Sequence, residues 1–311
     1  MPAARTTVIA AVTALASITL PNAAYAAPCC GDQSGLGARL GRDESLSLVA
    51  SFAFAERIGG YDGAGSYVGL GDAEERHVRF EQAIAIRANS RLEVGLRVPE
   101  VVGYRAIASE DEAGAGVGDP TAFARVTLVP VDDTTPAPAL FASVSAHVPL
   151  GRPPWLGSPL SSDVTGQGAG EISVGVSSDK TWGGRWFAAA GLGVGFFTPV
   201  ERGGARVQRG PRVTVDAATG PVFELDSLRT LACGVGLAYD GEVAPTIQGE
   251  DDTRGRFRLA LTAPFAIDLT ARWSLVGDVR CDLPADGAGA GDLAEVTTTL
   301  GVRFGARAWD L

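Results

Sequence analysis

Long apolar runs are missing from this sequence. After the N-terminal segment, no stretch approaches the roughly eighteen uninterrupted apolar residues that indicate a membrane-spanning helix. Apolar residues nevertheless make up 46% of the chain. We therefore expect no helix to span a membrane, and the apolar residues must be used in another pattern.

Lysine and histidine are also scarce. Lys180 is the single lysine and the formal net charge is −10, which leaves no basic stripe for nucleic acid. The only histidines are His77 and His147. On one strand, Ser145 would lie about 7 Å from His147, beyond direct hydrogen-bond reach. We expect a protein that is not an enzyme, with no catalytic residue, no cofactor, no metal site and no nucleic-acid partner.

The four cysteines do not predict a disulfide framework. An exported chain permits disulfides, but Cys233 and Cys281 fall on different predicted strands, near opposite ends of the predicted fold. The adjacent Cys29 and Cys30 have no role that the sequence assigns.

The first residues have the form of an export signal. Arg5 precedes a thirteen-residue apolar stretch from Val8 to Leu20, and Ala24-Tyr25-Ala26 has the small-x-small pattern of a cleavage site. We predict a signal peptide over residues 1–26, a periplasmic N-terminal segment over 27–44 and one domain over 45–311.

From residue 45 onward, apolar residues alternate with polar or small ones in segments of about ten residues. Alternation gives a strand one apolar face and one wet face, and about nine to eleven residues suffice to cross a membrane. The prediction is an all-β fold, a closed antiparallel up-and-down transmembrane β-barrel of about 12 strands. The clearest segments are 45–56, 74–87, 91–98, 140–148, 256–268 and 295–304.

Short and long connections alternate along the chain. Short turns are predicted at 88–90, 131–137, 179–184, 226–228 and 270–271, and long connections at 57–73, 100–118, 150–169, 199–211, 242–253 and 283–293. Bacterial barrels have short periplasmic turns and long external loops. The count of twelve requires a strand near 212–225, where Gly220-Pro221 is unfavourable, so ten or fourteen strands remain as alternatives.

Aromatic residues support this orientation, because barrels carry aromatic girdles at both membrane interfaces. Trp182, Trp186, Trp273 and Trp309 fall at the ends with short turns, and Phe54, Phe196, Tyr239 and Phe257 at the opposite ends. Core filling is the alternative interpretation, but it would not place the tryptophans at one rim.

A glycine-rich motif recurs before descending strands, at residues 69–72, 116–119, 168–171 and 289–292. No helical pattern follows these motifs, so they are poor dinucleotide fingerprints. Glycine tolerates bulge and corner conformations, and we interpret the motifs as bends from loop into strand.

These segments carry a family resemblance. Gly116-Val117-Gly118-Asp119 leads into Thr121–Leu128, Leu140–Val148 runs into Pro149-Leu150-Gly151, and Thr165-Gly166-Gln167-Gly168 precedes Ile172–Ser178. Over its central third the chain resembles outer-membrane proteins grouped under the phenol meta-degradation pathway and described as transporters. The resemblance implies a diffusion channel for small, often hydrophobic or aromatic, compounds, with no catalytic residues. The ending Trp309-Asp310-Leu311 departs from the terminal aromatic common among barrels.

The predicted lumen has one charged wall and one nearly bare wall. Small residues face inward at Ala189, Gly191, Gly193 and Gly195 and again at Ala232, Gly234, Gly236 and Ala238. The predicted lumen-lining residues are Arg79, Glu81, Glu93, Arg97, Arg125, His147, Glu171, Arg256, Arg258, Asp278, Arg280 and Arg303. Rings of charge can set selectivity in pores. For a single residue the favoured interpretation is pairing with an opposite charge, and for the set it is a narrow, charge-lined passage.

Three functions follow from this pattern. The first is an outer-membrane channel or transporter of a Gram-negative bacterium for passive uptake of small, hydrophobic or aromatic molecules. The second is a non-transporting structural or adhesive barrel with a plugged lumen, and the third is a secreted soluble sandwich. For a barrel, the expected partners are outer-membrane lipid and lipopolysaccharide, a small-molecule solute, and the barrel-assembly machinery during insertion.

Overall fold

The computed structural model describes residues 40–307, apart from 42, 62–65, 72, 133–134, 203, 227–228, 248–249, 252–254 and 284–292. The predicted signal peptide, the Cys29-Cys30 pair, Trp309 and the glycine motif at 289–292 lie outside the described residues. Within the described part of the chain, no helix is long and apolar enough to cross a membrane.

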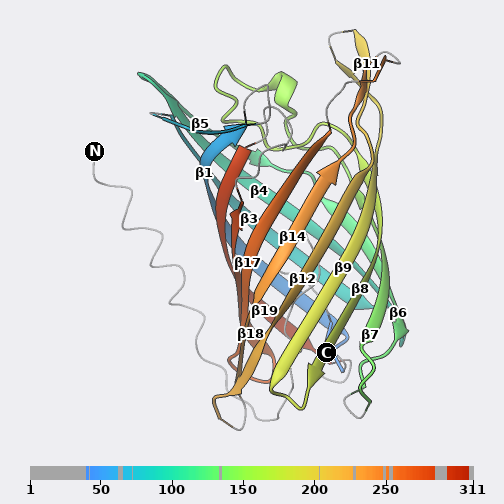
Figure 1. Ribbon diagram of the computed structural model, residues 1–311. Helices are drawn as coiled ribbons and strands as arrows, with labels where there is room; N and C mark the ends of the chain where they lie inside the picture. The colour runs from blue at the N-terminus through green and yellow to red at the C-terminus, as the bar shows by residue number, and fades with distance from the viewer. Residues whose placement is uncertain are drawn as a thin grey trace.

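Twelve antiparallel strands close into a barrel (Figure 1). One of the twelve is divided at Gly234, whose N–H donates to the carbonyl of Pro264 on the neighbouring strand. The barrel strands are β1 (Leu46–Tyr61), β3 (Glu74–Arg87), β4 (Leu92–Ile107), β6 (Thr121–Val129), β7 (Ala139–His147), β8 (Glu171–Trp182), β9 (Trp186–Phe197), β12 (Arg212–Glu224), the divided strand β13 (Thr230–Cys233) with β14 (Val235–Glu242), β17 (Arg256–Asp268), β18 (Trp273–Asp282) and β19 (Leu293–Ala306).

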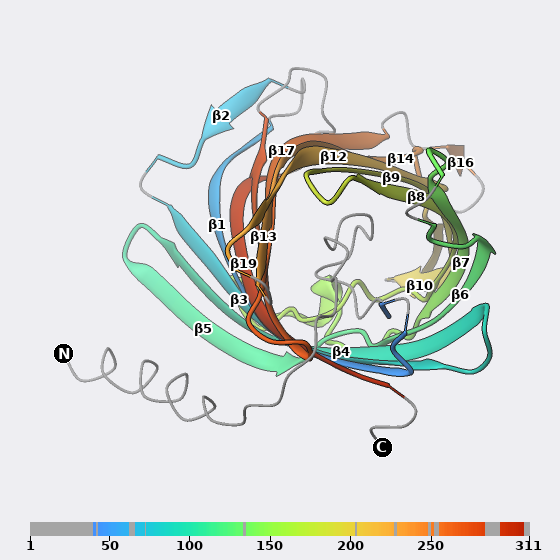
Figure 2. The ribbon, with the colours of Figure 1, turned by 90° about the horizontal axis from the view of Figure 1, so that it is seen from below.

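Each barrel strand pairs with the next along the chain, and pairing between β1 and β19 closes the ring. Seen along the axis, the strands are arranged in a ring (Figure 2). The predicted fold class and strand number are therefore confirmed. The uncertain strand is also present, because β12 pairs with β9 through Gly220 and Pro221 and with β14 on its other side.

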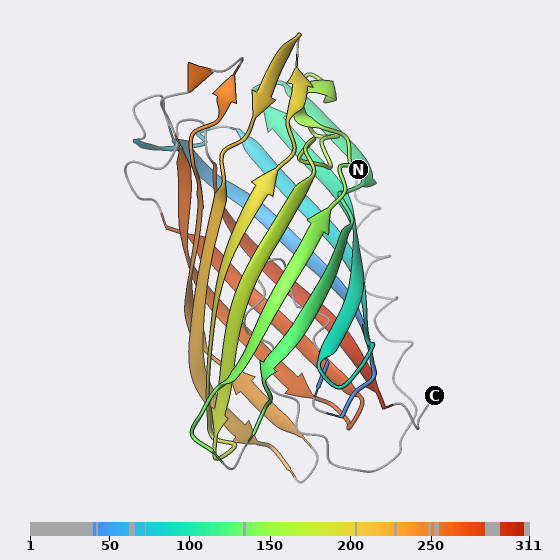
Figure 3. The ribbon, with the colours of Figure 1, turned by 90° about the vertical axis from the view of Figure 1, so that its right-hand side faces the viewer.

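The long connections are more ordered than the sequence predicted. In place of a loop over 100–118, β4 continues to Ile107 and forms a hairpin with β5 (Glu110–Val117) that flares from the wall (Figure 2). The segments 57–73, 199–211 and 242–253 also contain five short strands. One of them is β2 (Tyr67–Gly69). The other four form a separate small sheet above the barrel (Figure 3): β10 (Val200–Arg202), β11 (Ala205–Gln208), β15 (Thr246–Ile247) and β16 (Glu250–Asp251). Glycines and acidic residues in these segments hid the alternation.

One turn also differs from its prediction. The sequence predicted a turn over 179–184, but β8 continues through Trp182, and the turn is made by Gly183 and Gly184. Both glycines have positive φ, 54° and 66°, a conformation that residues with a Cβ rarely adopt.

Apolar side chains cover the outside of the barrel. Exposed apolar positions alternate along every wall, as at Leu48 and Phe52 on β1 and at Val174 and Val176 on β8. Residues between them face inward and are buried or hydrated. A strand wall with this alternation is stable in a bilayer, where lipid covers the apolar face and ring closure pairs the backbone groups.

The interior holds only small apolar clusters. One brings Leu40, Val49, Ala83 and Ala85 together against Phe123 on the inner wall. Phe187 is another inward side chain and is 2% exposed. Most of the interior is therefore polar, as expected for a barrel around a lumen.

Three of the four described tryptophans lie at the rim with short turns, and the fourth, Trp155, lies in the connection between β7 and β8. Trp182 and Trp186 flank one turn, with side chains exposed by 45% and 48%, and Trp273 begins β18 and packs on Phe304. The Trp186 indole N–H donates to the Thr219 hydroxyl at 2.7 Å. This placement is the one predicted for a membrane-interface girdle. Cys233 and Cys281 are both free thiols, as the sequence predicted.

Candidate functional site: the lumen and its mouth

The strand register places the twelve predicted lumen residues on inward-facing positions. Arg79 and Glu81 follow Glu75 and His77 on the inner face of β3, and Glu93 and Arg97 share the inner face of β4 with Arg105. The others occupy the same face of their strands: Arg125 on β6, His147 on β7, Glu171 on β8, Arg256 and Arg258 on β17, Asp278 and Arg280 on β18, and Arg303 on β19. Their part in selectivity stays a prediction.

Charge pairing dominates the lower part of the charged wall. Arg125 donates to the Glu93 carboxylate, with Nε 3.0 Å from Oε2, and its guanidinium lies over the Phe141 ring. Arg303 donates to Glu44 at 3.0 Å. Glu93 and Arg303 are each 5% exposed, so these charges are compensated within the wall. A buried charge is tolerable in this way only because its partner is present.

The upper part of the opposite wall contains a second group of pairs. Arg212 binds the Asp240 carboxylate through two N–H groups, at 2.7 and 2.5 Å. Glu242 accepts from Arg209 at 2.8 Å and from Arg256 at 3.0 Å. Two-point guanidinium–carboxylate contacts are strong and directional. For these arginines, the structure supports pairing over a freely available positive charge.

Two further lumen arginines share Asp282. Arg280 Nε lies 3.2 Å from the Asp282 carboxylate, and Arg258 lies 3.8 Å from it and 3.9 Å from Glu295. These longer contacts leave the arginines partly hydrated, with about a quarter to a third of each side chain exposed. Among the arginines of the lumen, these two are therefore well placed to act on a passing ion.

Small and hydroxyl side chains line the inner face from β7 to β9. Gly191 and Gly193 face inward on β9, opposite the inward Ser177 and Gly175 of β8. On β7, Ser143 faces inward at mid-strand and yet is exposed. An inward side chain can be exposed there only if the lumen beside it admits water. The small residues predicted for one wall are present on the inner face of β9, but the inward Asp216 and Thr214 of β12 lie against Gly191 and Gly193, so this wall is not bare throughout.

His147 sits in a row of inward side chains across three strands. The register aligns it with Thr121 on β6 and Glu171 on β8. Its Nδ1 lies 2.9 Å from the Thr121 hydroxyl, while the Glu171 carboxylate accepts from Ser173 at 2.8 Å. His147 thus contacts Thr121 rather than Ser145, and it lines the wall.

A loop folds into the mouth of the barrel. It connects β7 to β8 over residues 148–170, contains a single 3-10 turn at Pro154–Leu156, and lies within the outline of the barrel when seen along the axis (Figure 2). We call it the mouth loop. The Asp119 carboxylate holds both of its arms, accepting from the N–H of Gly151 at 2.8 Å and from that of Gln167 at 2.7 Å.

Two more anchors fix the tip of the mouth loop to the β4–β5 hairpin. Arg105, on the inner face of β4, donates to the carbonyl of Leu160 at 2.8 Å. The N–H of Leu160 donates in turn to Glu112 on β5 at 3.1 Å. Inside the loop, Asp163 accepts from the Ser158 N–H at 2.7 Å and pairs with Arg152. The loop is therefore a fixed part of the mouth.

The glycine motifs have a more specific role than the predicted bends. A Cβ at Gly118 would lie 2.9 Å from Pro99 and 3.1 Å from the carbonyl oxygen of Thr165 in the mouth loop, and one at Gly168 would overlap Trp155. Positive φ angles, typical of bends, occur at Gly71 and Gly168 but not at Gly116 or Gly118. The motif at 116–119 thus serves mainly to let the mouth loop approach and to present Asp119.

The outer surface of the mouth loop is apolar. Leu150 and Leu156 are 68% and 59% exposed, and Pro154 and Pro159 are exposed beside them. Sequence reasoning placed a long connection here but missed its position in the lumen. It also missed Arg105, Asp119, Arg209 and Arg212, because their partners lie on segments distant in the sequence.

Comparison with known proteins gives a fold and no family. No model of a known protein family matches the chain, and no curated protein matches it. Among solved structures, the chain is similar to an outer membrane channel from Pseudomonas putida F1, with a TM-score of 0.65 and 15% identity, covering 84% of this chain and 95% of that one. It is also similar to the beta domain of the Bordetella autotransporter BrkA, with a TM-score of 0.53 and 11% identity, covering 85% and 100%. These likenesses show that the fold is that of outer-membrane β-barrels.

Proposed function

We propose that the protein is an outer-membrane channel for passive uptake of small molecules. The observation that carries this proposal is Ser143, which faces inward at mid-strand and is nevertheless exposed. A closed barrel with an apolar exterior and a lumen that admits water provides a route across a bilayer. The similarity to the Pseudomonas putida channel supports the proposal by fold.

The mouth and the lumen together favour small solutes that carry no net charge. The exposed Leu150 and Leu156 give apolar or aromatic solutes a surface on which to bind at the mouth. Paired charges such as Arg212 with Asp240 leave the wall without a strong field of one sign. These features agree with the family resemblance, so we further propose membership of the phenol meta-degradation group of outer-membrane proteins.

Liposome swelling with the purified chain tests the proposal. We expect swelling with alanine and slower swelling with sucrose. We also expect faster swelling with phenylalanine than with arginine, because arginine carries a net charge and the lumen, whose own charges are paired, favours solutes without one. A chain that folds into lipid but gives no swelling with alanine would contradict the channel and favour the plugged barrel. An equal rate for phenylalanine and arginine would contradict only the preference for uncharged solutes.

A further inference from the structure

The wall of the barrel has a gap at its upper rim, where β9 and β12 separate. Their hydrogen-bond ladder ends at the pair Gly195 and Arg212, and the ladder between β12 and β14 ends at Arg212 and Glu242. Beyond this level the chain leaves the barrel for the small upper sheet. The Gln208 side chain supplies the missing hydrogen bond, with its amide donating to the Phe197 carbonyl at 2.7 Å.

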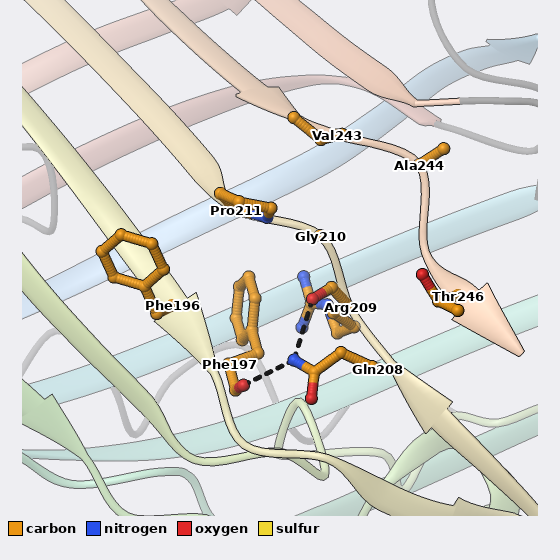
Figure 4. Close-up of a pocket in the computed structure, with 9 residues that line it drawn as sticks. All are labelled: Phe196, Phe197, Gln208, Arg209, Gly210, Pro211, Val243, Ala244 and Thr246. Carbon is orange, nitrogen blue, oxygen red and sulfur yellow. Dashed lines mark hydrogen bonds between the residues drawn. The ribbon is translucent and has the colours of Figure 1, made fainter. Parts of the chain in front are cut away.

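A pocket of about 470 Å³ occupies this gap. Figure 4 shows it between the end of β9 and the segment that enters β12, with the Phe197 ring beside the Arg209 side chain. Its lining is Phe196, Phe197, Gln208, Arg209, Gly210, Pro211, Val243, Ala244 and Thr246. Pockets for small ligands measure roughly 300–1,000 Å³ and are mainly apolar with a few polar groups. This pocket has that size and composition.

The charge in the pocket is already compensated. Arg209 is the one charged residue of the lining; its guanidinium carbon lies 3.7 Å from the centre of the Phe197 ring. Its Nε donates to Glu242 at 2.8 Å and its Nη1 to Gln167 at 2.9 Å. A charged ligand would have to displace one of these bonds, so the pocket favours an uncharged one. The faces of the Phe196 and Phe197 rings favour an aromatic one.

The lining of the pocket includes exposed side chains on the lipid side of the wall and a buried ring on the lumen side. Phe196 continues the outward row of Leu192 and Val194 and is 54% exposed, and Val243 is 57% exposed. Phe197 points to the other side and is 5% exposed. Phe196 also lies at the rim opposite the tryptophans, where an aromatic girdle marks the membrane interface.

From this geometry we infer that the gap is a binding site for a small, uncharged aromatic molecule that arrives from the outer leaflet. The stacked Phe197 and Arg209 separate this site from the lumen. The inference deepens the proposed function and rests on it, because it names the solute class and the place where that solute is first held.

Crystals soaked with 4-bromotoluene test the inference, since bromine gives an anomalous signal that lipid and detergent do not. We expect a bromine peak between Phe196, Phe197 and Val243 in the wild type. The Ala244→Trp variant fills the pocket and should lose the peak. Ala217→Trp, on the outward face of β12 and away from the pocket, is the matched control and should keep it. If Ala244→Trp does not fold, Val243→Trp replaces it.

No bromine peak in the wild-type pocket, or a peak that persists when Ala244→Trp fills it, would overturn the inference. Conductance in KCl, measured on the same three proteins, separates this result from the channel proposal. We expect equal conductance in all three, because the pocket lies outside the water-filled lumen. Absent conductance in all three with a bromine peak in the wild type would contradict the channel and leave the binding site standing.

Discussion

The Asp119 carboxylate lies 2.8 Å from the backbone nitrogen of Gly151, and through this bond the last residue of a glycine motif holds the mouth loop in the lumen. Its second oxygen accepts the Gln167 N–H. Both arms of the loop thus depend on one carboxylate that is 9% exposed. Hydrogen bonds to a charged acceptor contribute about 1.5–3 kcal/mol each.

Replacing Asp119 with alanine should release the mouth loop. Two backbone N–H groups would lose their acceptor, and we expect larger conductance with more frequent current fluctuations in single-channel records. Asp111→Ala, on the exposed tip of the β4–β5 hairpin, is the control and should leave the records unchanged. Identical noise in Asp119→Ala and wild type would show that the loop is held by other contacts.

Acid should weaken the same loop. The hydrogen bond from the Ser158 N–H lowers the pKa of Asp163 below its ordinary value of 3.8. A carboxyl with a lowered pKa stabilises the folded loop while it is ionised, at pH values above 3.8, and this contribution is lost as the pH falls through the lowered pKa. Current fluctuations should therefore stay constant from pH 7 to pH 5 and rise only below pH 4 or so. In Asp163→Asn, the high-pH noise should already exceed that of the wild type.

The buried pair of Glu93 and Arg125 should contribute to the stability of the barrel. Glu93→Gln leaves the Arg125 guanidinium, 12% exposed, without its counter-charge. Removing one partner of a buried pair costs about 3–5 kcal/mol. We expect a lower urea midpoint for the heat-modifiable band in gel electrophoresis. The double variant Glu93→Gln with Arg125→Gln should recover part of the lost stability. If it recovers none, the loss comes from altered packing and not from the unpaired charge.

Ion selectivity should respond to the two loosely paired lumen arginines. Replacing Arg258 and Arg280 with glutamine leaves the Asp282 and Glu295 carboxylates uncompensated. A nearby charge in water is worth on the order of 1 kcal/mol, or roughly a fivefold change in a permeability ratio. The potassium-to-chloride ratio from reversal potentials should rise accordingly. Arg256 and Arg258 replaced together should shift it in the same direction, because Arg256 pairs with Glu242.

The barrel could be predicted from the sequence because its signal is local. Alternation along β1 or β17 assigns each side chain to the lipid face or the lumen face without knowledge of any other strand. A shift of the strand register by one residue would point every inward arginine toward lipid. Trp182, Trp186 and Trp273 then identify one rim. The hairpin of β4 and β5 was missed because Gly114 and Gly116 interrupt the alternation of apolar and polar residues. The hairpin extends beyond the barrel wall, where no lipid-facing apolar residues are required.

The contacts of the lumen could not be predicted in the same way. The sequence places Glu93 and Arg125 on inward faces, but only the strand register brings their charges together. The mouth loop depends on still longer separations, such as the 48 residues between Asp119 and Gln167. Its anchors are single hydrogen bonds to backbone groups, which leave no pattern in side-chain composition. The gap beside Phe197 also leaves no pattern in side-chain composition, because it forms where the hydrogen-bond ladder between β9 and β12 ends.

Single-channel recording of the purified chain in a planar bilayer tests the central claim most directly. The exposure of the inward Ser143 in a closed, lipid-facing barrel predicts discrete conductance steps in KCl that grow when Asp119→Ala frees the mouth loop. A folded, inserted barrel that carries no current, both as wild type and as Asp119→Ala, would contradict a passage through the lumen.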